Sequence, residues 1–135
     1  MKISEVARDT GLSSKTIRYY EDIALIPPAA RSVNGYRDYD DGAVQELTFL
    51  AHAREVGFNL DECRQLLDLQ RNPQRQSAHA KELVLEKVDQ LEHRIAALNR
   101  MCEQLRDMAG RCHGDEGPEC AILNDLGKHG ACGHE

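Results

Sequence analysis

A strict apolar repeat between residues 79 and 109 constrains the fold more than any other feature of the sequence. Apolar side chains recur there in alternating steps of four and three residues, at Val84, Val88, Leu91, Ile95, Leu98, Cys102, Leu105 and Ala109. A repeat of about 3.5 residues is typical of a coiled-coil seam, and the positions between are mostly charged or polar. No Gly or Pro interrupts the run before Gly110. The sequence therefore predicts one long helix with a narrow apolar stripe.

A narrow stripe of this length cannot be buried by the helix that carries it, so a partner helix is required. The sequence contains no second apolar repeat of comparable length, and we therefore expect the partner to be a second copy of the chain. The alternative is a long helix that packs along the core of its own domain. A stripe this narrow favours the homodimer, because a helix on a globular core presents a wider apolar face.

The charge distribution points to a nucleic-acid partner although the net charge of the 135 residues is −6. Six basic and four acidic residues give residues 1–37 a charge of +2, whereas residues 41–135 carry 11 bases and 17 acids. The length suits one small domain plus an oligomerisation element. The N-terminal segment is therefore the region where we expect a phosphate-facing surface.

Hydropathy and cysteine content indicate a cytoplasmic protein with reduced thiols and no membrane partner. The longest apolar runs cover only a few residues, and the N-terminus has no hydrophobic signal segment. Five cysteines in a chain without an export signal argue against a disulfide framework, so we expect reduced thiols that are available to metals.

The first 22 residues predict a helix-turn-helix. Residues 3–9 form a short amphipathic helix that Gly11 ends, where a left-handed residue costs little. Ser13 or Ser14 then caps a second helix over residues 15–22. Two short helices around a tight turn are the pattern of this DNA-binding motif.

The second helix carries the candidate base-reading residues. Ile17 would face the first helix, with one or both neighbouring tyrosines, so Lys15, Thr16 and Arg18 would face outward. Such side chains reach phosphates or base edges in a major groove. A solvated polar face is the alternative for any one of them.

A predicted hairpin over residues 31–39 would form a wing beside this motif. Asn34-Gly35 is a strong hairpin-turn sequence, in which we expect both residues to have positive φ. Arg31 and Arg37 flank the turn, with Tyr36 beside them. Cationic and aromatic side chains on a rigid hairpin suit contact with a phosphate backbone.

Two further helices are expected before the long one. The third ends at Gly57, and Asn59 with Glu62 forms a capping box that starts the fourth. Phe58 and Cys63 would pack together as a hydrophobic staple across that start. We therefore interpret Cys63 as a small buried apolar residue and not as a metal ligand.

Three segments resemble the MerR family of transcription regulators, and the similarity covers about residues 1–108. They are Thr10-Gly11-Leu12-Ser13-Ser14-Lys15-Thr16-Ile17-Arg18-Tyr19-Tyr20-Glu21, Arg31-Ser32-Val33-Asn34-Gly35-Tyr36-Arg37-Asp38-Tyr39 and Ala53-Arg54-Glu55-Val56-Gly57-Phe58. Residues 112–115 and 120–123 resemble the copper-efflux branch of that family. Ser77 fits as well, because the resemblance implies cysteine at this position in sensors of divalent ions and serine in the monovalent-ion branch.

The resemblance implies a mostly α fold and a domain order. A winged helix-turn-helix head over 1–70 precedes a hinge at 71–77 and a dimerisation helix over 78–109 that forms an antiparallel coiled coil. A metal-binding loop and short helix would occupy 110–126, and a flexible His/Cys tail 127–135.

The same resemblance implies how such a protein acts. A homodimer would bind double-stranded promoter DNA whose −35 and −10 elements are too far apart, with and without metal. Metal binding would then change the twist and bend of the DNA so that RNA polymerase engages. If the matching positions have the roles that the resemblance implies, Lys15, Arg18 and Tyr19 would lie at the major groove. Tyr36 and Arg37 would hold the DNA backbone, and Arg54 would contact a further phosphate.

Cys112 and Cys120 are the candidate metal ligands. Their spacing is not a zinc signature, and two incidental thiols in a loop remain the alternative. Two thiolates without a further evident ligand suit Cu(I), Ag(I) or Au(I), whereas structural Zn(II) takes four ligands. Helical spacing after Cys120 places this residue at a helix start, where the amide dipole lowers a thiol pKa. That start would also stabilise the single negative charge of a bis-thiolate with a monovalent ion.

Other functions remain to be weighed against a Cu(I)-responsive regulator. A divalent-ion sensor could recruit His113 or the tail residues His129, Cys132 and His134, although Ser77 argues against it. Cys102 lies on the apolar stripe, where packing is the expected role. A cytosolic thiol metal buffer would not need a basic helix-turn-helix, and a thiol oxidoreductase would need a Cys-x-x-Cys pair, which is absent. No catalytic constellation stands out, so we expect no enzyme.

Overall fold

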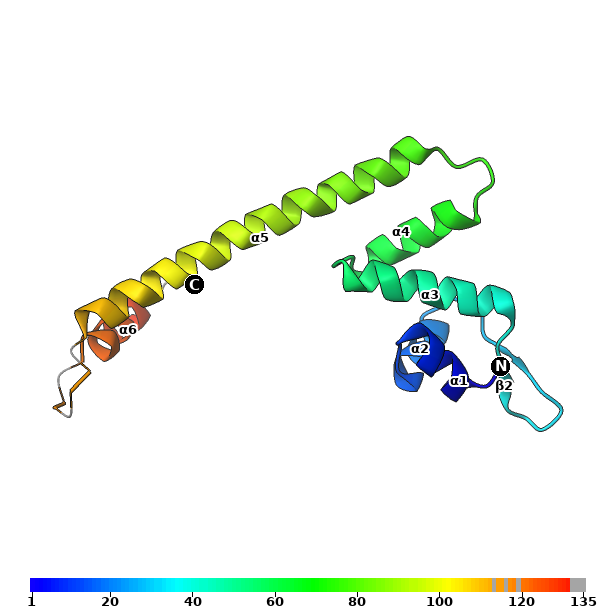
Figure 1. Ribbon diagram of the computed structural model, residues 1–135, viewed down its shortest axis with the longest axis horizontal. Coiled ribbons are helices and arrows are strands. Elements are labelled where there is room, and N and C mark those ends of the chain that lie inside the picture. Colours follow the sequence, from blue (N-terminus) through cyan, green and yellow to red (C-terminus); the bar gives the residue numbers. More distant parts are fainter. Residues whose placement is uncertain (113, 116, 119, 132–135) are drawn as a thin grey trace. The chain divides into compact units, whose positions relative to one another are not determined.

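The computed structural model describes residues 1–112, 114–115, 117–118 and 120–131, with only the backbone described for 128–131. The described chain is mostly helical, as predicted (Figure 1). Its elements are α1 (Ile3–Thr10), α2 (Ser14–Asp22), β1 (Ala30–Arg31), β2 (Arg37–Asp38), α3 (Asp41–Glu55), α4 (Leu60–Arg71), α5 (Ser77–Arg111) and α6 (Ala121–Ala131). The chain divides into two compact units, Met1–Lys87 and a second unit that begins at Val88.

The first unit is built around one apolar core, which α1 to α4 and the hairpin enclose. Its fully buried side chains include Val6, Ile17, Leu25, Ile26, Tyr39, Leu47, Leu50, Cys63 and Leu67. They come from each of the four helices and from the segments between them, so the helix-turn-helix is held by long-range packing as well as by its own turn.

Side-chain caps define the helix starts of this unit. Ser13 Oγ accepts the Thr16 amide at 3.0 Å and Asp40 Oδ1 accepts the Ala43 amide at 2.8 Å. Gly11 ends α1 with φ 81°, as predicted for a left-handed C-cap. These caps satisfy amides that a helix leaves without intrahelical partners.

The predicted capping box and staple at the start of α4 are both confirmed. Asn59 Oδ1 accepts the Glu62 amide at 2.9 Å, and Glu62 Oε1 accepts the Asn59 amide at 2.8 Å. Phe58 and Cys63 are buried, and Cys63 Sγ lies 3.8 Å from the Phe58 carbonyl oxygen. Burial raises the pKa of the Cys63 thiol. Cys63 is thus a packed, protonated thiol within the core.

The wing is a short antiparallel hairpin in which Arg31 pairs with Arg37. Its turn differs from the prediction, because only Gly35 has a positive φ (82°) and Asn34 does not. The Gly35 amide donates to the Ser32 carbonyl at 2.9 Å, and the Ser32 amide donates to the Tyr36 carbonyl at 2.7 Å. A three-residue hairpin loop of this kind needs a single left-handed residue at its end, and glycine supplies it.

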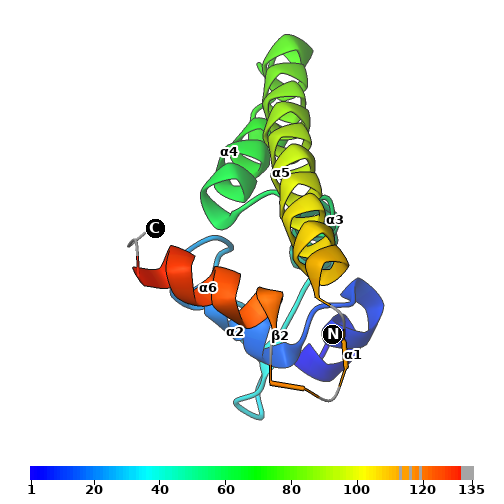
Figure 2. The ribbon, with the colours of Figure 1, turned by 90° about the vertical axis from the view of Figure 1, so that its left-hand side faces the viewer.

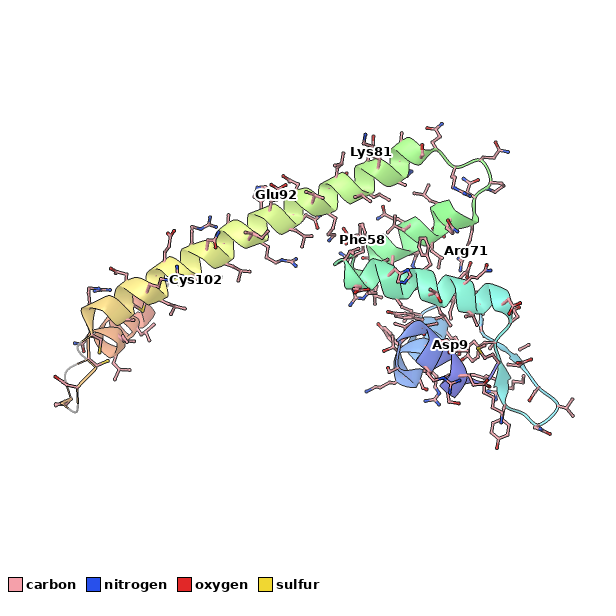
Figure 3. All side chains as sticks on the ribbon, viewed as in Figure 1. Asp9, Phe58, Arg71, Lys81, Glu92 and Cys102 are labelled. Carbon is pink, nitrogen blue, oxygen red and sulfur yellow. The ribbon has the colours of Figure 1, made fainter. Side chains whose placement is uncertain are left out.

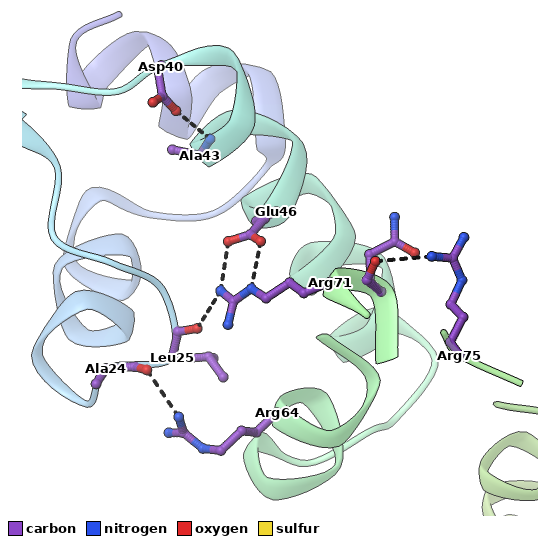
Figure 4. Close-up of polar contacts among 9 residues, drawn as sticks. Ala24, Leu25, Asp40, Ala43, Glu46, Arg64, Arg71 and Arg75 are labelled. Atoms are coloured by element: carbon purple, nitrogen blue, oxygen red, sulfur yellow. Dashed lines mark hydrogen bonds and ion pairs between the residues drawn. The ribbon is translucent and has the colours of Figure 1, made fainter. Parts of the chain in front are cut away.

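Two arginines of α4 attach this helix to the end of α2 (Figure 4). Arg64 donates to the carbonyl oxygens of Ile23 and Ala24, both at 3.1 Å. Arg71 donates to the Leu25 carbonyl at 3.3 Å and holds both carboxylate oxygens of Glu46 at 2.8 Å. The guanidinium groups therefore satisfy carbonyls that the end of α2 leaves open.

The long helix α5 has 35 residues and extends beyond its predicted bounds of 78 and 109. It begins at Ser77 and continues through Gly110, where we expected a loop, to Arg111. One glycine near a helix end costs only about 1 kcal/mol, and Arg111 supports the last turn by an ion pair with Asp107 at 3.1 Å. Figure 2 shows α6 following the far end of α5 after a loop.

The helix after the loop is also longer than predicted. It was expected to end near residue 126, but α6 continues to Ala131 and so includes the first residues of the segment 127–135 that we expected to be a flexible tail. Residues 132–135 of that tail, with Cys132 and His134, lie outside the described residues, as does His113. No helix in the described part of the chain is long and apolar enough to cross a membrane.

The apolar stripe of α5 is largely exposed in the single chain. Exposure is 43% for Val88, 57% for Ile95, 53% for Leu98 and 62% for Leu105, whereas Leu91 is half-buried. Figure 3 shows side chains projecting all along α5, with Lys81, Glu92 and Cys102 labelled on this helix. The stripe has the extent that the repeat predicts, and its apolar surface faces solvent unless another molecule covers it.

Candidate DNA-binding surface and metal site

The outward face of α2 carries polar and aromatic side chains because its inward face is fixed by the core. Ile17 and Tyr20 are buried, which turns Lys15, Arg18 and Tyr19 outward. All three are exposed, which confirms the prediction from helical spacing for Lys15 and Arg18, whereas that spacing left the direction of Tyr19 open. Thr16, which the same spacing predicts to face outward, is instead half-buried, and its hydroxyl oxygen accepts the Ser13 hydroxyl at 2.8 Å. Thr16 therefore belongs partly to the cap of its own helix.

A basic groove of about 640 Å³ lies between the start of α1, α2 and the wing. The described residues that line it are Lys2, Ile3, Ser4, Arg18, Arg31, Gly35, Tyr36 and Arg37. Four of these are cations and none is acidic. In a chain with a net charge of −6, this is a pronounced local excess of positive charge. Sequence reasoning missed Lys2, because position 2 belongs to neither the recognition helix nor the wing.

The wing arginines are held in place by internal contacts. Arg31 Nη1 donates to the Gly35 carbonyl at 2.9 Å, and Arg37 Nη1 lies 3.3 Å from Glu21 Oε2. The Glu21 side chain is only 3% exposed and also accepts the Ala29 amide at 3.2 Å. Glu21 is at the end of α2, so this ion pair with a buried carboxylate fixes the wing against α2.

Tyr39 is buried beside the same Glu21 carboxylate. Burial and the neighbouring Glu21 carboxylate raise the pKa of the Tyr39 phenol to about 12. The phenol is therefore neutral across the physiological range, and it packs beside the charged pair of Glu21 and Arg37.

The candidate phosphate contact Arg54 lies outside the residues that line the basic groove. Its Nη1 donates to the Phe58 carbonyl at 2.9 Å, so part of the guanidinium secures the turn between α3 and α4. It also lies beside Tyr20, where burial raises the phenol pKa and the Arg54 charge opposes that rise.

The loop after α5 brings Cys112 and Cys120 together. Their Sγ atoms are 3.8 Å apart, and both residues are half-buried. Two metal–sulfur bonds of about 2.3 Å span at most about 4.6 Å, so one ion can bridge the pair, and a linear arrangement needs only a slight widening. The sequence could propose this pair, but only the fold shows that the two sulfurs lie close enough for one ion to bridge them.

Cys120 caps helix α6. Its carbonyl oxygen accepts the Asn124 amide at 3.1 Å, and its Sγ accepts the Leu123 amide at 3.5 Å. The Leu123 amide, aided by Cys112 and the Ile122 amide, lowers the pKa of the Cys120 thiol. The predicted place of Cys120 at a helix start is thus confirmed. A thiolate in this position receives amide N–H groups in addition to any metal.

The described surroundings of the thiol pair offer structural support and no further evident ligand. Arg111, at the end of α5, forms an ion pair with Asp125 of α6, which holds the helix that Cys120 begins. Within the described residues, no group of three or more His, Cys, Asp or Glu side chains gathers as a metal site. Cys102 is exposed on α5, and Ser77 is exposed at the first position of that helix.

The first unit is a winged helix-turn-helix with a basic groove, which defines a DNA-binding protein. Residues 1–70 match the model of the MerR HTH family regulatory protein, and residues 44–108 match that of MerR, DNA binding. The chain belongs to the MerR family of transcription regulators, whose members are not enzymes.

Relatives extend the similarity over nearly the whole chain. The HTH-type transcriptional regulator CueR of Salmonella typhi is 47% identical over 135 residues, which are 100% of this chain and 96% of that protein. CueR of Yersinia pestis is 51% identical over 126 residues, 93% of this chain and 91% of that protein. Among solved structures, the transcription regulator PbrR691 from Ralstonia metallidurans CH34 in complex with lead(II) has a TM-score of 0.80 at 32% identity, covering 93% of this chain and 98% of its own.

Proposed function

We propose that this chain is a Cu(I)-responsive transcription activator that binds promoter DNA as a homodimer and senses the ion through Cys112 and Cys120. The observation that carries the proposal is the pair of thiols 3.8 Å apart, one of which receives the amides at the start of α6. A soft ion that accepts two thiolates matches this donor set.

Charge supports a monovalent ion over a divalent one. Two thiolates with Cu(I) retain one negative charge, whereas with a divalent ion they are neutral. The Leu123 amide at Cys120 stabilises negative charge, so it favours the monovalent complex. The similarity to the CueR proteins and the serine at position 77 point the same way. Ag(I) and Au(I) share this chemistry and are expected to bind as well.

The second candidate is a sensor of a divalent ion. PbrR691, which shares the fold at 32% identity, is described in complex with lead(II). In this chain a divalent ion would need a further donor, such as His113 or the tail. A cytosolic thiol metal buffer is an alternative from another class of protein, but metal buffering does not require the basic groove.

The exposed stripe of α5 supports the homodimer. A second copy supplies a stripe of the same length, and an antiparallel pair of these helices would bury both. Two heads would then meet two half-sites of a promoter.

On DNA, α2 would occupy the major groove and the wing would lie on the backbone. Lys15, Thr16, Arg18 and Tyr19 are assigned to the recognition helix. Arg31, Asn34, Gly35, Tyr36 and Arg37 are assigned to the wing, and Arg54 to a further phosphate. Metal binding would change the distortion of an overlong promoter spacer, so that RNA polymerase engages.

The test is a competitive titration of the reduced dimer with Cu(I) and Zn(II) against chelators of known affinity. Wild type is compared with Cys112→Ser and Cys120→Ser, and with Cys102→Ser as a matched thiol control. One Cu(I) per chain, bound tightly by wild type and Cys102→Ser but lost in the other two variants, with much weaker zinc, is the expected result. Zinc held as tightly as copper would reject the Cu(I) assignment and leave the DNA-binding head intact.

In vitro transcription tests the output. A promoter fragment recovered by selection with the wild-type protein should give more transcript when Cu(I) is added, and no increase with Cys120→Ser. Equal transcription with and without Cu(I) in wild type would refute the activator.

A further inference from the structure

We propose that Lys2 binds a backbone phosphate of DNA within the basic groove and so adds an anchor beside the recognition helix and the wing. The inference rests on the DNA-binding part of the proposed function and does not depend on which metal is sensed. Lys2 belongs to neither element that the helix-turn-helix and wing patterns identify.

The groove gathers cations from three parts of the chain. Lys2 stands at the start of α1, Arg18 projects from α2, and Arg31 and Arg37 come from the wing. None of the described lining residues is acidic. These four positive charges repel each other, so a bound anion would reduce the electrostatic repulsion within the groove.

The four cations are not equivalent. Arg31 is bonded to the Gly35 carbonyl, and Arg37 is paired with the buried Glu21. The Lys2 and Arg18 side chains, in contrast, make no hydrogen bond or ion pair with any residue that the structure describes. The nearby Glu5 directs Oε1 to the backbone amide of Lys2 at 3.2 Å, and not to its ammonium group. The Lys2 charge is therefore available to an external anion.

Lysine suits a phosphate contact that positions the protein without reading sequence. Its ammonium group is a compact charge on a flexible stem, so it reaches a phosphate oxygen without the fixed bidentate geometry that arginine uses on guanine. Exposed hydroxyl groups of Ser4 and Tyr36 line the same groove and can donate to the same anion. We expect Lys2 to contribute affinity equally on all sequences.

Salt dependence gives the direct test. Binding of wild type and Lys2→Gln to a duplex selected with wild type is measured over a range of salt concentrations. The slope of log K against log salt should become shallower by about 0.9, the value for one phosphate contact. Lys81→Gln, which removes an exposed lysine of α5 outside the groove, should leave the slope unchanged. Thermal unfolding of each variant checks that the fold is intact.

A charge-neutral phosphate locates the contact. Single methylphosphonates are placed along the duplex, and one position should weaken wild type but cause no further loss in Lys2→Gln. The loss from Lys2→Gln should also be equal on selected and scrambled duplexes. Two results would overturn the inference about Lys2: an unchanged salt slope, or methylphosphonate effects that persist at every position in the variant. In either case, sequence-preferring binding by wild type would still support the proposed function. Failure of wild type to bind any duplex overturns both.

Discussion

Apolar side chains have opposite environments in the head and along the long helix. In the head, Val6, Ile17 and Leu47 are completely buried, whereas on α5 Ile95 and Leu98 are more than half exposed. Both sets follow helical spacing, so the pattern alone does not distinguish them. The difference shows that the head completes its core within its own unit, while the stripe of α5 remains an exposed apolar surface.

Lys87 marks where the two environments meet on α5. It is 5% exposed, with Nζ 2.8 Å from Glu62 Oε1 and 5.7 Å from the centre of the Phe58 ring, while the next residue, Val88, is 43% exposed. Lys87 thus links α5 to α4 through a charged side chain, whereas the stripe residue that follows it is exposed.

The largest effect is expected from Ile95→Asp in the stripe. Each copy would lose about 1.5–3 kcal/mol of burial, or about 3–6 kcal/mol for a symmetric dimer, which weakens dimerisation about 10²- to 10⁴-fold. Sedimentation equilibrium should detect monomers. Glu92→Asp, on the charged face, is the matched control and should remain dimeric. A dimer of unchanged affinity in Ile95→Asp would show that α5 is not the dimer interface.

Leu47→Ala in the head should destabilise the fold by about 2–5 kcal/mol, because it opens a cavity in a packed core. Urea unfolding monitored by circular dichroism measures the loss. Leu98→Ala, the same change on the stripe, should cost stability only at protein concentrations where the dimer forms. If both variants depended equally on concentration, the head would not be an independent core.

Lys87→Met should reduce stability by about 1–3 kcal/mol, between the values for exposed and buried pairs, since it leaves the Glu62 carboxylate without its ammonium partner. Burial opposes ionisation of Glu62, but its bonds to Lys87 and the Asn59 amide hold its pKa below the ordinary value. Lys81→Met, at an exposed position of the same helix, should change stability by less than about 0.5 kcal/mol. Equal losses of unfolding free energy in the two variants would show that the Lys87–Glu62 pair does not stabilise the fold.

The smallest effect is expected from Glu46→Gln and depends on pH. The Arg71 bonds lower the pKa of Glu46 from its ordinary value of 4.5. Because the folded-state pKa is the lower one, this stabilisation is complete above about pH 4.5 and is lost as the pH falls through the folded-state value. The pair is partly exposed, so the difference at pH 7 should be about 1 kcal/mol or less. Urea unfolding at pH 7 and pH 3 should show the gap between wild type and variant closing at acid pH.

Some residues of the DNA-binding surface and of the thiol pair were predictable from the sequence, and others were not. Residue types and helical spacing were enough for the outward positions of Lys15 and Arg18 and for the start of α6 at Cys120, but not for the half-burial of Thr16. The groove residue Lys2 was missed, because the grouping of α1 with the wing depends on contacts between segments distant in sequence. Arg37 was assigned only to DNA, since nothing in its local sequence reveals the buried carboxylate of Glu21 that holds it.

Local rules account for what the sequence alone determined. Caps, a left-handed glycine, helical periodicity and the 3.5-residue stripe each depend on neighbours within a few positions. They correctly predicted that the helices, the wing and the apolar stripe exist, although α5 and α6 continue beyond their predicted ends. Hydrogen bonds, ion pairs and packing across the fold decided the rest. They set the single left-handed residue of the wing turn, the attachment of α4 to the end of α2 through Arg64 and Arg71, and the 3.8 Å between two thiols that stand eight positions apart. The number of positions between two such residues in the sequence does not determine their distance in space. Only the tertiary structure therefore brings them together.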